Sequence, residues 1–234
     1  MQLLGLKILM LGASHLATPG YFGTILHNQL ADQGAIVHTL AVCGAFPSHW
    51  VLPTQGNCGS LEKVGGNPAD YRIGKNPNTK SYLELVALES PALVILVMGD
   101  SIANYSAPTM DKKWAYQEIQ KLTSTIDGSK VSCLFIGPPW GTEGGNSKKT
   151  NIRVREVSDF LKINVKPCKY IDSLKLSRSG EWATTDGLHL MKKGYDAGKK
   201  VSGIKRHIGH FVIHNSRQNP SQEKLKETDG LGKH

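Results

Sequence analysis

The feature that most constrains the fold is an alternation of short apolar runs with longer amphipathic segments. Apolar runs of strand length occupy residues 6–12, 35–42, 91–100, 131–137 and 168–173. Segments whose apolar residues recur at helical spacing occupy residues 21–34, 81–90, 110–126, 148–164 and 190–208. Strands that alternate with helices form parallel sheets with helices on both faces. We therefore expect an α/β fold, a three-layer α/β/α sandwich around a mostly parallel sheet of five strands.

Two stretches fall outside this alternation. Residues 43–80 contain Gly, Pro and Asn throughout and are predicted to form a long functional loop with short turns. The polar residues 213–234 show no periodicity, which is typical of a flexible tail. A chain of 234 residues can hold one α/β domain with a full core. We expect a single domain over residues 1–212 and a polar tail after it.

The charge balance is basic, with 28 Lys and Arg against 19 Asp and Glu and a net charge of +9. An anionic partner such as an acidic polysaccharide, a cell-wall polymer, a membrane surface or a nucleic acid fits this balance. Many of these basic residues lie in the last third of the chain, where solvated helix faces explain them. The chain has no phosphate-binding glycine motif and no apolar run near the roughly 18 residues of a membrane span. We expect no nucleic-acid partner, no organic cofactor and no metal.

The four cysteines bear on the compartment. Cys43 and Cys58 bracket a loop, and Cys133 and Cys168 each lie at the start of a predicted strand. Two disulfides would indicate an extracytoplasmic location, and four buried free thiols are the alternative. The chain begins almost directly on a strand-like run, without the regions of a signal peptide. Either the protein is cytoplasmic or a signal or anchor has been removed, and we expect a periplasmic or extracellular protein.

Polar residues and glycines follow the predicted strands. Ser14 comes after the first strand, Gly44 after the second, "GDSIAN" (99–104) after the third and "GPPWG" (137–141) after the fourth. The carboxyl ends of parallel strands meet at one edge of a sheet, where helices begin. We therefore expect these segments to converge on one site.

Ser14 is a candidate nucleophile. A serine hydroxyl needs a histidine base, and that histidine needs an orienting acid. His15 is adjacent, but its side chain should point away from that of Ser14. Asp186 and His189 lie three residues apart in "TTDGLHL", so their side chains can share one side of the backbone. Taken separately, each residue also has an ordinary explanation, the serine as a helix cap and the Asp-His pair as a helix start.

Together these residues resemble the SGNH hydrolases, also called GDSL esterases/lipases. "LGASH" resembles the first block of that family, with Ala13 in place of an aspartate, "VCGAFPSHW" contains the second-block glycine, and "DGLHL" matches the last block. The resemblance extends from residue 6 to about residue 208 and implies a flavodoxin-like SGNH hydrolase fold. It implies that Ser14 is the nucleophile, His189 the base and Asp186 the orienting acid. It also places Gly44 and the Ser14 backbone N–H in the oxyanion hole.

One block departs from the family pattern. The family has Gly-x-Asn-Asp after the third strand, whereas "MGDSIANY" places Ser101 at the asparagine position and Asn104 three residues later. Either the Ser101 hydroxyl is the donor, or a remodelled loop brings Asn104 to the site, or the hole has backbone donors alone. Loss of a side-chain donor costs a few kcal/mol of transition-state stabilisation.

The substrate class follows from weaker signals. Trp50, Trp140 and Trp182 lie in loops at or next to the predicted edge, where indoles stack on sugar rings or simply pack in loop cores. We predict a serine esterase that removes small acyl groups, most simply acetyl, from a carbohydrate or cell-wall polysaccharide. One alternative is an O-acetyltransferase with the same triad, served by a membrane partner that delivers the acyl group. The other is a non-catalytic polysaccharide-binding relative.

Overall fold

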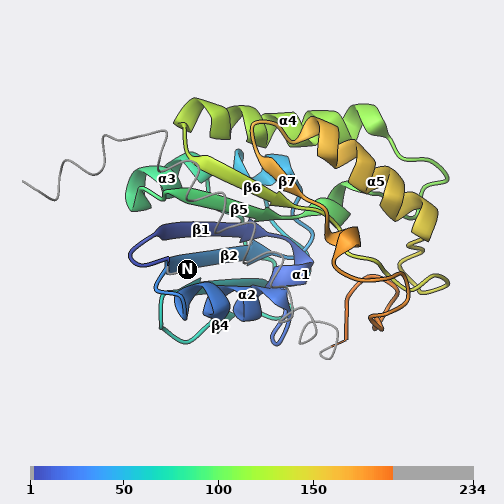
Figure 1. Ribbon diagram of the computed structural model, residues 1–234, viewed down its shortest axis with the longest axis horizontal. Helices are drawn as coiled ribbons and strands as arrows, with labels where there is room; N and C mark the ends of the chain where they lie inside the picture. Colours follow the sequence, from blue (N-terminus) through green and yellow to red (C-terminus); the bar gives the residue numbers. More distant parts are fainter. Residues whose placement is uncertain (1–2, 192–234) are drawn as a thin grey trace, which may run out of the picture.

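Strand β1 lies at the centre of a seven-stranded sheet with the order β4-β3-β2-β1-β5-β6-β7. The computed structural model describes residues 3–191 (Figure 1). The strands are β1 (Lys7–Gly12), β2 (Ile36–Val42), β3 (Ser60–Val64), β4 (Asp70–Tyr71), β5 (Leu93–Val97), β6 (Ser132–Ile136) and β7 (Lys169–Ile171). Strands β2, β1, β5, β6 and β7 run parallel, and β3 and β4 are antiparallel additions at one edge. The expected mostly parallel α/β architecture is confirmed.

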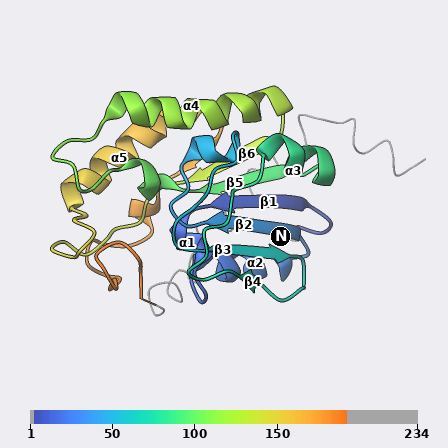
Figure 2. The ribbon, with the colours of Figure 1, turned by 180° about the vertical axis from the view of Figure 1, so that it is seen from behind.

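The predicted number of strands is too low, because β3 and β4 lie in the segment that was predicted to be a loop (Figure 2). In β3 the inward positions are Leu61 and Lys63, which are 1% and 8% exposed. Lys63 reaches a polar partner by donating from Nζ to the Asn67 carbonyl at 2.5 Å. A lysine at an inward position breaks the alternation of apolar and polar residues that identifies a strand. β4 has two residues, too few to show any period.

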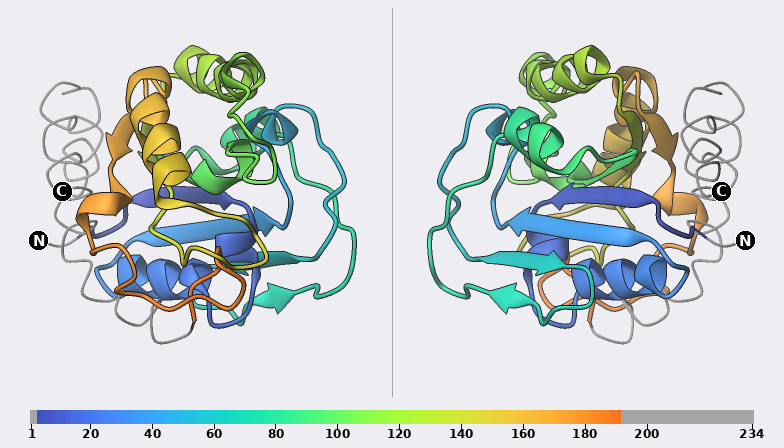
Figure 3. Two further views of the ribbon diagram at one scale, coloured as in Figure 1. Left: turned by 90° about the vertical axis from the view of Figure 1, so that its right-hand side faces the viewer. Right: turned by 90° about the vertical axis from the view of Figure 1, so that its left-hand side faces the viewer.

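Helices cover both faces of the sheet, as the end-on views show (Figure 3). One face carries α1 (Ser14–Ala17) and α2 (Phe22–Ala31), and the other carries α3 (Tyr82–Glu89), α4 (Lys112–Ser129) and α5 (Asn151–Asn164). Short 3₁₀ helices are η1 (Pro47–Trp50), η2 (Gly99–Ile102) and η3 (Ser173–Lys175). The helix predicted over 190–208 and the tail over 213–234 lie outside the described residues. Within residues 3–191, no helix combines the length and apolar character needed to cross a bilayer.

The alternation of side chains along β1 builds two cores. Leu9 and Leu11 pack with residues of α3, α4 and α5, whereas Ile8 and Met10 pack with residues of α1 and α2. Successive side chains of a strand point to opposite faces, so a central strand covered on both sides must be apolar throughout. Polar residues of the site can therefore occur only after the carboxyl ends of β1, β2 and β5, where the chain leaves the buried sheet.

The two disulfides lie at opposite ends of the parallel strands, one near their carboxyl ends and the other near their amino ends. Cys43 follows the carboxyl end of β2 and is bonded to Cys58, which precedes β3. Cys133 lies near the amino end of β6 and is bonded to Cys168, which immediately precedes β7. None of the four cysteines is a free thiol. Of the two alternatives that the sequence left open, the bridged one is therefore correct.

Candidate active site

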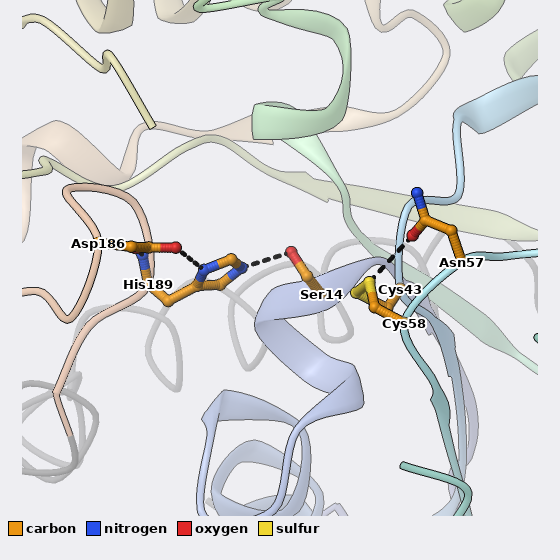
Figure 4. The surroundings of a disulfide bond; sticks show 6 residues. All are labelled: Ser14, Cys43, Asn57, Cys58, Asp186 and His189. Carbon is orange, nitrogen blue, oxygen red and sulfur yellow. Dashed lines mark hydrogen bonds and ion pairs between the residues drawn. A yellow bond between two sulfur atoms is a disulfide. The ribbon is translucent and has the colours of Figure 1, made fainter. Parts of the chain in front are cut away.

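Ser14, His189 and Asp186 form a continuous chain of contacts at the carboxyl edge of the sheet (Figure 4). Ser14 is the first residue of α1, directly after β1 and Ala13. Its Oγ lies 2.7 Å from His189 Nε2, and His189 Nδ1 lies 2.7 Å from Asp186 Oδ2. The structure thus brings together the three residues that the sequence blocks singled out, across 172 to 175 positions of chain.

The loop that carries Asp186 and His189 is held by its own backbone. Asp186 Oδ1 accepts hydrogen bonds from the backbone N–H groups of Leu188 and His189, at 2.9 and 2.8 Å. The Asp186 carbonyl accepts from Ser147 N at 2.9 Å, and the Gly187 carbonyl accepts from Thr142 N at 3.0 Å. The segment after β6 therefore fixes the position of this loop, which in turn fixes the carboxylate against the imidazole.

The protonation states follow from these contacts. Burial raises the pKa of Asp186, but hydrogen bonds from the His189 backbone, the His189 ring and the Leu188 backbone outweigh it, so the net pKa is lowered. An ionised carboxylate only accepts hydrogen bonds, so His189 Nδ1 carries the ring proton. His189 Nε2 is then the acceptor of the Ser14 hydroxyl proton. This is the tautomer that a general base requires.

Two predicted backbone donors are present at this edge. As the first residue of α1, Ser14 has a backbone N–H with no intrahelical partner. Gly44 lies in a turn after β2 with a φ of +83°, a conformation that favours glycine. Within the described part of the chain, the Gly44 N–H has no hydrogen-bond acceptor.

The predicted side-chain donors are placed differently from either expectation. The Ser101 hydroxyl donates its single proton to the Met98 carbonyl at 2.7 Å, inside the η2 turn, so in this conformation that proton is not directed to an oxyanion. Asn104 follows η2 in a left-handed conformation with a φ of +40°, and its side chain is exposed. Its carbonyl accepts from Arg153 at 3.1 Å, which fixes the backbone. The Ser101 hydroxyl is thus bonded within the η2 turn itself. The sequence motif alone does not reveal such an internal hydrogen bond.

The prediction that tryptophans bind sugar is wrong for two of the three. Trp50 is fully buried in the core between the sheet and α3 to α5. Trp140 is 7% exposed, and its ring N–H donates to the Leu174 and Ser177 carbonyls. Trp50 therefore packs in the main core, and Trp140 is held under the loop that follows β7. Trp182 is partly exposed, and its role stays a prediction.

A buried polar cluster beside the triad was not predicted. Asp100 lies in η2, where its carboxylate contacts His15 Nε2 at 2.9 Å, Lys149 Nζ at 2.8 Å and the Tyr105 hydroxyl. The Lys149 side chain is 1% exposed and that of Asp100 is 7% exposed. The His15 ring centroid lies 5.2 Å from that of His189. The block "GDSIAN" identified the position of Asp100, but no local pattern pairs it with Lys149, because 49 residues separate the two.

Burial and the neighbouring charged groups together determine the protonation states of Asp100 and His15. Burial raises the pKa of Asp100, but the Lys149 ammonium and the His15 hydrogen bond outweigh it and hold the pKa well below its usual range. Burial lowers the pKa of His15 more than Asp100 raises it. His15 is therefore a neutral ring that donates from Nε2 to the Asp100 carboxylate. That nitrogen is occupied and cannot accept the Ser14 proton.

The cluster also supports the loop of the triad. A Cβ added to Gly141 would lie 2.2 Å from the Gly187 carbonyl and 2.6 Å from Lys149 Cδ. The lysine stem and the backbone next to Asp186 therefore meet at the place that a side chain at position 141 would occupy. Among residues 3–191, no group of three or more His, Cys, Asp or Glu side chains is arranged to hold a metal ion.

The chain is similar in sequence to the curated protein BcsX of Komagataeibacter xylinus. The two are 32% identical over 194 residues, which cover 82% of this chain and 73% of BcsX. No family model matches the chain.

Solved structures with the same fold include esterases. A peptidoglycan O-acetylesterase superposes with a TM-score of 0.58 at 13% identity, over 90% of this chain and 92% of that protein. A GDSL-like lipase from Bacteroides thetaiotaomicron superposes with a TM-score of 0.52 at 14% identity, over 87% of this chain and 88% of the lipase. At these identities the likeness is one of fold.

Proposed function

Because the chain belongs to the family of the protein BcsX and has the fold of the SGNH hydrolases, we propose that it is a serine esterase. Its substrate in this proposal is a carbohydrate or cell-wall polysaccharide that carries small acyl groups, chiefly acetyl. The observation that carries the proposal is the unbroken chain from Ser14 Oγ through His189 to Asp186. In such a chain the histidine takes the serine proton and the carboxylate orients the histidine, which makes the hydroxyl nucleophilic.

The reaction proceeds in two halves. Ser14 Oγ attacks the ester carbonyl carbon while His189 Nε2 takes the hydroxyl proton, and Asp186 stabilises the imidazolium that forms. The backbone N–H groups of Ser14 and Gly44 donate to the oxyanion. His189 then protonates the departing sugar oxygen, which leaves an acyl group on Ser14. A water molecule, deprotonated by His189, attacks this acyl-enzyme, and His189 returns the proton to Ser14 Oγ as the carboxylic acid leaves.

The substrate class and the compartment rest on separate support. A peptidoglycan O-acetylesterase shares the fold, and the net charge of +9 suits an acidic polymer. Two disulfides in a chain of this size favour an oxidising compartment. We place the protein in the periplasm or outside the cell.

The first test is Ser14→Ala, with Ser124→Ala, an exposed serine of α4, as the matched control. We expect Ser14→Ala to lower kcat on 4-nitrophenyl acetate by about 10⁴-fold or more, because removal of a triad nucleophile leaves only binding and the oxyanion donors. The Ser124→Ala variant keeps the kcat of the wild-type protein. Urea unfolding of both variants checks the fold. Equal hydrolysis by Ser14→Ala and wild type would refute the triad.

The second test separates hydrolysis from acyl transfer. The wild-type protein is incubated with an acetylated polysaccharide, with and without a soluble sugar acceptor, and free acetate and acetylated acceptor are both quantified. We expect free acetate in both conditions, because water is the second substrate of an esterase. Acetylated acceptor at the expense of acetate would identify an O-acetyltransferase with the same triad.

A further inference from the structure

The oxyanion hole proposed above has two backbone donors and no side-chain donor from the segment after β5. The Ser101 hydroxyl donates inside its own turn, and Asn104 lies beyond the end of η2. We propose that Asn57, in the loop between η1 and β3, supplies the side-chain N–H of the oxyanion hole. This inference rests on the proposed function, because it assigns a further catalytic residue to the same reaction.

The Asn57 amide lies directly against the Gly44 backbone. A Cβ added to Gly44 would lie 2.5 Å from Asn57 Oδ1 and 3.1 Å from Asn57 Nδ2. Position 44 therefore excludes a side chain for two reasons, its φ of +83° and the space that the amide occupies. The side-chain amide of Asn57 thus lies beside the Gly44 backbone, in the place that a side chain at position 44 would occupy.

Strand register places this pair beside Ser14. Gly12 of β1 pairs with Ala41 of β2, so Ser14 and Cys43 each come two residues later at the same edge of the sheet. Figure 4 shows Ser14 between His189 on one side and the Cys43, Asn57 and Cys58 group on the other. The developing oxyanion forms on the carbon that Ser14 Oγ attacks. The face of Ser14 away from His189 is where donors are needed.

The orientation of the amide leaves its donor available. Asn57 Oδ1 lies 3.0 Å from Cys58 Sγ, a contact without a proton because that sulfur is part of a disulfide. Figure 4 shows Nδ2 on the opposite side of the amide, pointing away from the disulfide. Within residues 3–191, Nδ2 donates no hydrogen bond to the protein. Two N–H groups are therefore free to bind an anionic oxygen.

The segment that carries Asn57 is fixed to the end of β2. The Asn57 backbone N–H donates to the Cys43 carbonyl at 3.2 Å, and the Cys43 N–H donates to the Gly59 carbonyl at 2.9 Å. The Cys43–Cys58 disulfide adds a covalent link between the same two segments. Donors that are held in place before the reaction stabilise an oxyanion without any cost of reorganisation. Asn57 is exposed, and these contacts are what hold its backbone in place beside Gly44.

The test compares Asn57→Ala and the isosteric Asn57→Asp with Asn104→Ala, the competing assignment. We expect both Asn57 variants to lower kcat on 4-nitrophenyl acetate by about 10²–10³-fold with little change in KM, because the lost contact forms in the transition state. Asn104→Ala keeps the wild-type kcat. Thiol titration and urea unfolding show that each variant retains its disulfides and its fold.

Ser14→Ala is assayed in parallel, so that two failures can be told apart. If Ser14→Ala is inactive while both Asn57 variants keep the wild-type kcat, the esterase stands and the assignment of Asn57 is overturned. A large loss of kcat in Asn104→Ala with none in Asn57→Asp also overturns it. If Ser14→Ala hydrolyses the ester as fast as wild type, the proposed function and this inference fall together.

Discussion

At the scale of single residues, the ring centroids of His15 and His189 lie 5.2 Å apart, but the two rings have different hydrogen-bond partners. His189 links Ser14 to Asp186, whereas His15 Nε2 is bonded to Asp100. We expect His189→Ala to lower kcat by about 10⁴-fold or more, because the base is lost. His15→Ala should stay within about tenfold of wild type, yet lower the free energy of unfolding by about 1–3 kcal/mol, because a buried carboxylate oxygen loses its donor.

The two variants are measured by ester hydrolysis and by urea unfolding. A large loss of kcat in His15→Ala, with little loss in His189→Ala, would show that the wrong histidine is assigned as the base. Retention of full stability in His15→Ala would show that water replaces the donor to Asp100.

Some of these residues could be predicted from the sequence and others could not, for a physical reason. Ser14, Asp186 and His189 lie in short blocks, where the neighbouring residues shape the turn that presents them. The partners of Asp100 are distributed differently, since Lys149 precedes α5 and looks like any exposed lysine at a helix start. Its burial is a consequence of how η2 packs against the segment after β6. Asn57 could not be singled out from the sequence either. The role proposed for it depends on the Cys43–Cys58 disulfide, which was only one of two alternatives for these cysteines.

At the scale of elements, the two disulfides make different contributions. Cys43–Cys58 closes 15 residues at the edge that holds Ser14, and Cys133–Cys168 closes 35 residues at the opposite edge. The chain-entropy model assigns about 3 and about 4 kcal/mol of stability to loops of these lengths. We expect Cys133→Ser/Cys168→Ser to lower stability and leave kcat near wild type. Cys43→Ser/Cys58→Ser should lower both, because it frees the segment next to Gly44.

Urea unfolding and 4-nitrophenyl acetate kinetics on the two double variants give the comparison. The kinetics are recorded at a temperature where both variants remain folded by circular dichroism. Equal kcat values for the two variants would mean that the Cys43–Cys58 bridge has no part in arranging the site.

The elements themselves were predictable where burial imposes a period. β1, β5 and β6 carry buried apolar residues on both faces, so their runs stand out from the helices between them. β3 and β4 lie at an edge of the sheet, where a single face is buried and a lysine can turn inward. The carboxyl end of the third predicted strand was also overestimated, since β5 stops at Val97 and the next residues enter η2. Because of this early turn, Asp100 lies against His15, whose ring is next to that of His189.

At the scale of the whole molecule, the parallel sheet explains why distant segments meet. Register aligns Gly12 with Ala41 and Val97, and Val97 with Ile136, so four segments leave the sheet at one edge. This convergence was predictable from strand order alone. The loop of Asp186 and His189 reaches the same edge from beyond β7, and its contacts with the segment after β6 complete the site.

The pH dependence of stability is also a property of the whole fold. His15 and His27 are buried, at 8% and 0% exposure, and burial lowers the pKa of each below its ordinary value. The free energy of unfolding should therefore fall as the pH drops below about 6.5, the ordinary pKa of histidine, because the unfolded chain binds protons that the folded chain refuses. Each histidine contributes at most about 1.4 kcal/mol per pH unit.

Urea unfolding at several pH values between 5.5 and 7.5 measures this slope, and His27→Gln identifies one source. His27 bonds Thr39 and the Gly65 carbonyl, each at 2.8 Å, so the variant is less stable than wild type at pH 7.5. Its loss of stability between pH 7.5 and 5.5 should nevertheless be smaller, because glutamine takes up no proton in either state. A steeper slope in His27→Gln, or a wild-type stability that rises toward pH 5.5, would contradict a neutral buried His27.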